Sequence, residues 1–122
     1  YDSYSVSVFF GKGDATFQSA VNYFVGSKPT GIVLSDFDRD SSLDIAITNT
    51  NDDYISVLFG VGNGSFGIPV KYTSSNGPLG ITSIDLNNDS KVDIAVANVN
   101  NGNVSVLLGR VDEVFNNKFD FP

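Results

Sequence analysis

The chain repeats itself with a period of 49 residues. Residues 6–54 align with residues 55–103 without a gap, and 19 of the 49 aligned positions are identical. The last 19 residues match the start of the same unit and stop before it is complete. A fixed period of this length is typical of repeat architectures, in which each unit buries its apolar faces against its neighbours. The fold is therefore predicted to be built from copies of one supersecondary unit.

Each unit is predicted to contain four short β-strands, A to D, because β-branched and aromatic residues alternate with period two between runs of Gly, Asn, Asp and Pro. In the first complete unit these strands are expected at 31–35, 44–49, 54–60 and 68–73. In the second they are expected at 80–84, 92–97, 104–108 and about 117–121. The chain opens with C and D alone, at 5–10 and 19–25. No segment shows sustained helical periodicity, so we expect an all-β fold with almost no helix.

Four-stranded antiparallel units at this spacing are typical of β-propeller blades. We expect about two and a half blades, in the order C-D, A-B-C-D, A-B-C-D: a half blade at 1–29, a first blade at 30–78 and a second at 79–122. A propeller ring needs at least about four blades. The chain is therefore expected to form a homo-oligomer or to join the remainder of a longer propeller.

Two acidic loops recur inside the repeat, at 36–44 and 85–93. Each carries oxygen-bearing side chains at loop positions 1, 3, 5 and 9. Packing does not require this pattern, whereas Ca²⁺ takes about six to eight oxygen ligands and can draw them from alternate residues of a tight loop. A solvated Asp- and Asn-rich turn is the alternative for either loop alone. Because the same spacing occurs twice, we expect two Ca²⁺ sites per chain.

The composition excludes several classes of function. The net charge is −7, so binding to nucleic acid or to an anionic membrane is disfavoured, because both need clustered Lys and Arg. The longest aliphatic run is about four residues, too short for membrane insertion. Without Cys or His, thiolate sites and the commonest general base are missing. Outside the two loops, Asp112 and Glu113 form an acidic pair, but it is expected to lie in a C–D turn. We therefore do not expect an enzyme.

The loop spacing Asp-x-Asp-x-Asp-x-x-x-Asp, followed by Ile-Ala-Ile or Ile-Ala-Val and then by a strand ending in Leu-Phe-Gly, resembles the FG-GAP (VCBS-type) repeat of integrin α subunits. The resemblance covers the whole chain and implies a β-propeller that binds Ca²⁺ in its A–B loops. In the first loop it implies side-chain ligands Asp36, Asp38, Asp40 and Asp44, with the backbone carbonyl of Ser42. In the second it implies Asp85, Asn87, Asp89 and Asp93, with the backbone carbonyl of Lys91.

Two departures from the family pattern affect these sites. Loop position 6 is usually Gly, where the backbone turns sharply, but here it is Ser41 and Ser90. A non-Gly residue in a left-handed conformation costs on the order of 1 kcal/mol. The second loop also has Asn87 in place of an acid and Lys91 beside the site, so we expect it to bind Ca²⁺ more weakly than the first loop.

The resemblance implies an extracellular or cell-surface module that binds a protein or glycan partner. The alternatives are an architectural fragment that assembles itself into a closed ring, and a lectin-like glycan binder. Aromatic residues that recur at the repeat spacing are expected to pack between blades, with sugar stacking as the alternative role. These residues are Phe10, Phe17, Tyr23, Phe59, Phe66 and Tyr72.

Overall fold

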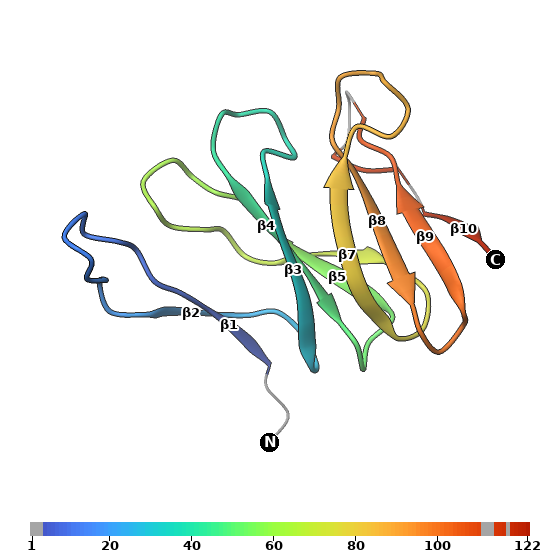
Figure 1. The fold of residues 1–122 in the computed structure, drawn as a ribbon, viewed down its shortest axis with the longest axis horizontal. Coiled ribbons are helices and arrows are strands. Elements are labelled where there is room, and N and C mark those ends of the chain that lie inside the picture. The colour runs from blue at the N-terminus through green and yellow to red at the C-terminus, as the bar shows by residue number, and fades with distance from the viewer. Residues whose placement is uncertain (1–3, 111–113, 117) are drawn as a thin grey trace.

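A computed structural model describes residues 4–110, 114–116 and 118–122 of the chain (Figure 1). The described residues form strands, turns and irregular segments, and none of them belongs to a helix that could cross a membrane. The strands are β1 (Ser5–Val8), β2 (Val21–Phe24), β3 (Pro29–Ser35), β4 (Asp44–Asn49), β5 (Tyr54–Leu58), β6 (Val70–Thr73), β7 (Pro78–Ile84), β8 (Asp93–Asn98), β9 (Asn103–Leu107) and β10 (Phe119–Phe121).

These strands form three antiparallel sheets in which sequence neighbours are also spatial neighbours. β1 pairs with β2, the strands β3 to β6 form one four-stranded sheet in sequence order, and β7 to β10 form another. The predicted all-β fold and the strand order C-D, A-B-C-D, A-B-C-D are therefore confirmed. Both A strands begin two residues earlier than expected, at Pro29 and Pro78, and their pairing register shifts just after the proline. Proline has no N–H to donate, so an irregular start to the ladder is expected there.

The two complete sheets contact each other mainly through their first strands, β3 and β7, which lie side by side (Figure 1). Threonine hydroxyls at the end of the first sheet bind the second sheet's backbone. Thr48 Oγ1 donates to the carbonyl of Leu79 at 3.0 Å, and Thr50 Oγ1 donates to that of Pro78 at 2.9 Å. A Cβ atom on Gly31 would lie 2.5 Å from the Leu79 carbonyl oxygen, so this approach requires glycine.

The main core fills the space between the two four-stranded sheets. Its aromatic centre is Phe115, which is 3% exposed and makes edge contacts with Phe37 and Tyr72 at centroid distances of 5.4 and 5.1 Å. The aliphatic members come from the facing strands of both sheets: Ala46, Ile55, Val57, Ile94, Val96 and Leu107. Each sheet alone exposes an apolar face, and stacking covers it.

A smaller core joins the β1–β2 pair to the opposite face of the first sheet. Tyr23 packs edge-on against Phe66 at 5.6 Å, which is the same contact that Tyr72 makes with Phe115 one repeat later. The buried members of this core are Val25, Ile45, Ile47 and Leu58. The predicted packing role of the recurring aromatics is thus confirmed for Tyr23, Tyr72, Phe59 and Phe66.

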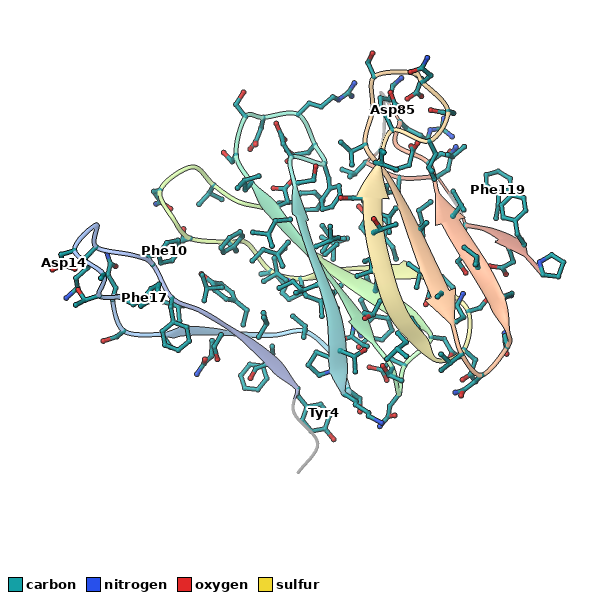
Figure 2. The ribbon with its side chains drawn as sticks, viewed as in Figure 1. Tyr4, Phe10, Asp14, Phe17, Asp85 and Phe119 are labelled. Atoms are coloured by element: carbon teal, nitrogen blue, oxygen red, sulfur yellow. The ribbon has the colours of Figure 1, made fainter. Side chains whose placement is uncertain are left out.

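The two ends of the stack leave equivalent aromatic residues uncovered. Phe17 corresponds to Phe66 and Phe115 but is 64% exposed, and Phe121 corresponds to Tyr72 but is 56% exposed. Figure 2 shows Phe10 and Phe17 at the β1–β2 end and Phe119 at the other. Asp112 and Glu113, the acidic pair expected in a C–D turn, lie outside the described residues.

The contrast between equivalent positions gives a stability test. We expect Phe115→Ala to lower the free energy of unfolding by about 3–5 kcal/mol, because it empties the centre of the main core. Phe17→Ala, the matched control, removes an exposed ring and should change stability by less than about 0.5 kcal/mol. Urea unfolding of both variants would check this, and equal losses would contradict the stacked arrangement.

Candidate metal centre

The first acidic loop joins β3 to β4 and is held by its own carboxylates. Asp36 accepts the backbone N–H groups of Asp40 at 3.1 Å and of Ser41 at 2.9 Å. Asp40 in turn accepts the N–H of Ser42 at 2.8 Å. These bonds curl the loop inward, so that one carboxylate oxygen each from Asp36, Asp38 and Asp40 lies within 4.8 Å of the others.

The tight loops require left-handed backbone at two positions each. Ser41 and Ser90, at loop position 6, have φ of 72° and 67°, as the family pattern predicted. Arg39 and Asn88, at position 4, also have positive φ, of 62° and 63°, which the spacing did not predict. A local strain of this kind persists where surrounding bonds hold it, and here the loop carboxylates supply them.

The acid at loop position 9 has a different role from the other three. Asp44 is fully buried, and its two oxygens accept the N–H of Phe37 at 2.7 Å and of Gly60 at 2.9 Å. Asp93 repeats both bonds, with Leu86 and Gly109, at 2.7 Å each. Phe37 and Leu86 are at position 2 of their loops, while Gly60 and Gly109 follow strand C. The aspartate therefore ties the A–B loop to the far end of strand C.

This bond explains why glycine recurs after strand C. A Cβ on Gly60 would lie 2.3 Å from the carbonyl oxygen of Leu43, and a Cβ on Gly109 would lie 2.6 Å from that of Val92. Any side chain would push strand C away from the loop. The sequence spacing alone suggests that Gly60 is an ordinary turn residue. The one sequence signal of its packing role is that glycine returns at the end of every strand C.

The electrostatics of the first loop favour a cation. Desolvation, followed by the charges of Asp44 and Asp40, raises the pKa of the Asp38 carboxyl above its usual value. Desolvation also raises the pKa of Asp44, although the N–H groups of Gly60 and Phe37 partly offset it. Both shifts mean that holding the Asp38 and Asp44 carboxylates ionised costs free energy, and a cation bound in the loop would reduce that cost.

The second loop has the same backbone but a weaker charge. Asp85 accepts the N–H groups of Asp89 at 3.1 Å and of Ser90 at 2.8 Å, as in the first loop. Lys91 Nζ lies 3.2 Å from Asp89 Oδ2. Desolvation acts to raise the pKa of the Asp89 carboxyl, but the hydrogen bonds and charge of Lys91 outweigh it and lower that pKa. Asn87 adds a neutral amide beside Asp89 where the first loop has an acid. The ammonium of Lys91 already balances part of the negative charge of this loop.

The structure thus brings together three of the predicted ligands in the first loop: Asp36, Asp38 and Asp40. Asp44 is adjacent but outside that group, with both oxygens bonded to backbone N–H. Carboxylates with exposed edges suit Ca²⁺, which binds carboxylate, carbonyl and water oxygen together. The first loop fits such an ion. The roles of Ser42 and Lys91 carbonyls, and of the second loop's side chains, stay predictions.

Comparison with known families gives one match. The model of the FG-GAP-like repeat matches residues 36–96, which is half of the 122-residue chain. The chain belongs to the FG-GAP-like repeat family. The matched segment runs from Asp36, the first residue of the first loop, to the middle of β8, so it includes both acidic loops. Searches of curated proteins and of solved structures gave no match.

The contact between glycine and loop in this FG-GAP-like repeat can be tested directly. Gly60→Ala should destabilise the chain by about 1–3 kcal/mol, because the added Cβ overlaps the Leu43 carbonyl. Gly11 is the equivalent residue of the half blade, and a Cβ there meets nothing within 4 Å. Thermal unfolding should therefore show a loss for Gly60→Ala and none for the control Gly11→Ala. A Gly60→Ala variant as stable as the parent chain would contradict the close approach of strand C to the loop.

Proposed function

We propose that this chain is a calcium-binding β-propeller module that serves as an extracellular scaffold for binding or adhesion. The observation that carries the proposal is the convergence of the Asp36, Asp38 and Asp40 carboxylates within 4.8 Å. Calcium modules outside the cell bind with Kd of about 10⁻⁴ to 10⁻³ M, which a small open cluster of this kind suits.

The role proposed for the ion is structural. The loop that would hold it joins β3 to β4, and Asp44 links Phe37 of that loop to Gly60, two residues beyond the end of β5. One ion would therefore brace three strands of the blade. The shell of carboxylate, backbone and water oxygens gives no reason to assign catalysis, and a protein or glycan partner would bind elsewhere on the scaffold.

Calcium titration tests this function. Starting from chelator, Ca²⁺ added to about 100 times Kd should raise the unfolding free energy by about 2.7 kcal/mol per occupied site. Replacing Asp36 and Asp38 by Asn should remove the first site's share and leave the second. Asp53→Asn, an exposed acid outside both loops, is the control and should bind like the parent chain.

The second loop offers a gain-of-affinity arm. Lys91→Ser copies the residue of the first loop and removes the ammonium beside Asp89. We expect it to tighten calcium binding at the second site, measured by calorimetry in the background that lacks the first site. No thermal shift with Ca²⁺ in the parent chain would overturn the proposed function.

Self-assembly into a ring is the second candidate function, and the exposed aromatics at the ends favour it. Inside the chain, each Tyr of strand D packs on a Phe of the next unit. At the ends, Phe121 and Phe17 occupy the two equivalent positions and are exposed, and among the described residues neither makes a ring contact. Head-to-tail stacking of copies would pair them, and a heterologous contact of this kind closes a ring or continues as a filament.

Mass in solution tests self-assembly. Light scattering at about 100 μM should show an oligomer, and Phe121→Ser or Phe17→Ser should each return it to the monomer. Phe24→Ser is the matched control, because Phe24 is also exposed but has no counterpart in the Tyr–Phe pairs. A parent chain that is monomeric at this concentration would exclude this second candidate.

A further inference from the structure

Asparagine is followed by glycine at three places in the chain: Asn63-Gly64, Asn76-Gly77 and Asn101-Gly102. This dipeptide is chemically reactive, because glycine has no Cβ to keep its backbone nitrogen away from the side-chain amide of the preceding asparagine. Attack of that nitrogen on the amide carbon forms a cyclic imide and releases ammonia. The structure places the three pairs in different surroundings, so they differ in how easily this attack can occur.

Two of the pairs are restrained. The N–H of Gly102 donates to the carbonyl of Asn98 at 2.9 Å, so the nitrogen that would attack is already bonded. Gly77 is buried against the side chain of Asn100. The side-chain oxygen of Asn76 accepts a hydrogen bond from Nδ2 of the same Asn100 at 2.6 Å. At both places the attack would first have to break an existing contact.

The pair Asn63-Gly64 is accessible. Both residues are exposed, in the connection between β5 and β6. A backbone hydrogen bond from Val61 to the carbonyl of Ser65, at 3.1 Å, closes the turn around them. Among the described residues, none accepts a hydrogen bond from the N–H of Gly64. The nitrogen of Gly64 can therefore approach the amide without losing a bond.

The amide of Asn63 is held in a way that favours this attack. Its Oδ1 accepts the N–H of Ser65 at 3.0 Å and the hydroxyl of Ser65 at 2.6 Å. When the Gly64 nitrogen adds to the amide carbon, this same oxygen takes up the negative charge of the tetrahedral intermediate. Donors that already point at an atom on which charge develops stabilise the transition state. The turn therefore supplies both the nucleophile and the donors.

The product of the reaction also has a precedent in the fold. Asp14 is the counterpart of Asn63 one repeat earlier, in the turn between β1 and β2 (Figure 2). Its carboxylate accepts the N–H of Thr16 at 3.0 Å and the Thr16 hydroxyl as well, which are the bonds that Ser65 makes to Asn63. The hydroxyl and the N–H of Thr16 lower the pKa of the Asp14 carboxyl. A carboxylate at position 63 would keep the same turn.

We propose that Asn63 is a site of spontaneous deamidation, in which its own turn converts the side-chain amide to a carboxylate. The Gly64 nitrogen gives its proton to hydroxide and forms a bond to Cγ of Asn63. The Cγ–Nδ2 bond breaks, and the amide nitrogen takes up a proton from water and leaves as ammonia. Water then opens the imide. Opening at Cγ gives aspartate, and opening at the backbone carbonyl gives isoaspartate, in which the chain runs through the side chain.

The reaction would add one negative charge beside the first acidic loop. Gly62, Gly64 and Ser65 line the same cavity as Ser41 and Ser42 of that loop. The added charge makes the product separable from the parent chain by ion exchange. This inference depends neither on calcium binding nor on self-assembly.

Peptide mapping by mass spectrometry tests the site. The full chain is kept at mildly alkaline pH, where the Gly64 nitrogen loses its proton more readily, either folded or unfolded in urea. In the folded chain Asn63 should deamidate at least about tenfold faster than Asn76 or Asn101. In urea the three pairs should react within about threefold of one another, because the folded surroundings are lost. Equal rates in the folded chain, or a tenfold preference that persists in urea, would overturn the inference.

The repeat offers a matched pair of variants for the role of the hydroxyl. Ser65→Ala removes one of the two donors to Asn63 and should slow its deamidation at least about threefold in the folded chain, with no effect in urea. Thr16→Ala removes the equivalent hydroxyl beside Asp14 and should leave the rate at Asn63 unchanged. Both hydroxyls are exposed, so both variants should fold. A Ser65→Ala chain that reacts as fast as the parent would refute the assistance by this turn.

Asn63→Asp supplies the aspartate product in advance. It should unfold at the same urea concentration as the parent chain, because Asp14 occupies the same turn. It should also elute from an anion-exchange column with the aspartate fraction formed by the aged parent chain. A lower unfolding midpoint would contradict the fit of the product to the turn, and an aged chain without such a fraction would overturn the proposal.

Discussion

The bond between a buried aspartate and a glycine N–H organises each of the two four-stranded sheets. Asp44 and Asp93 each reach from the start of strand B to the end of strand C, and each also holds position 2 of the preceding loop. A buried carboxylate without partners would be costly, but one that accepts two N–H groups is satisfied. The glycine is needed because only a residue without Cβ lets the strand end approach the loop this closely.

Because of this bond, the acid at loop position 9 has a different role from the acids at positions 1, 3 and 5. The position-9 carboxylate is satisfied by the backbone, so the acids at positions 1, 3 and 5 are the ones left facing one another. Their mutual repulsion is what a cation would relieve. In the second loop the charge problem is reduced from within the chain, by Asn87 and by the ammonium of Lys91. The two loops share a backbone conformation, but only the second has a lysine ammonium beside its carboxylates.

Much of this structure was predictable because each position of one repeat unit can be compared with the equivalent position of the next. The strand order and the packing of Tyr23 and Tyr72 follow from periodicity, and the left-handed Ser41 and Ser90 follow from the family pattern at loop position 6. The aspartate–glycine bond was not predicted, because its partners lie 16 residues apart on different strands and spacing alone suggests a ligand and a turn residue. The positive φ at Arg39 and Asn88 was missed because neither residue type is restricted to that conformation.

The same periodicity lets exposure be read against expectation. An exposed leucine or isoleucine is ordinary on any protein surface. Here Leu43 and Ile32 have counterparts one repeat later that are packed, so their exposure follows from their place beside the two-stranded β1–β2 sheet and not from residue type. Gly11 makes the point most sharply, since its counterparts are glycine for a steric reason that Gly11 itself lacks in this chain. Stacked units contact only adjacent units, so the same residue type is packed where a second four-stranded sheet lies beside it and exposed where the described residues place none.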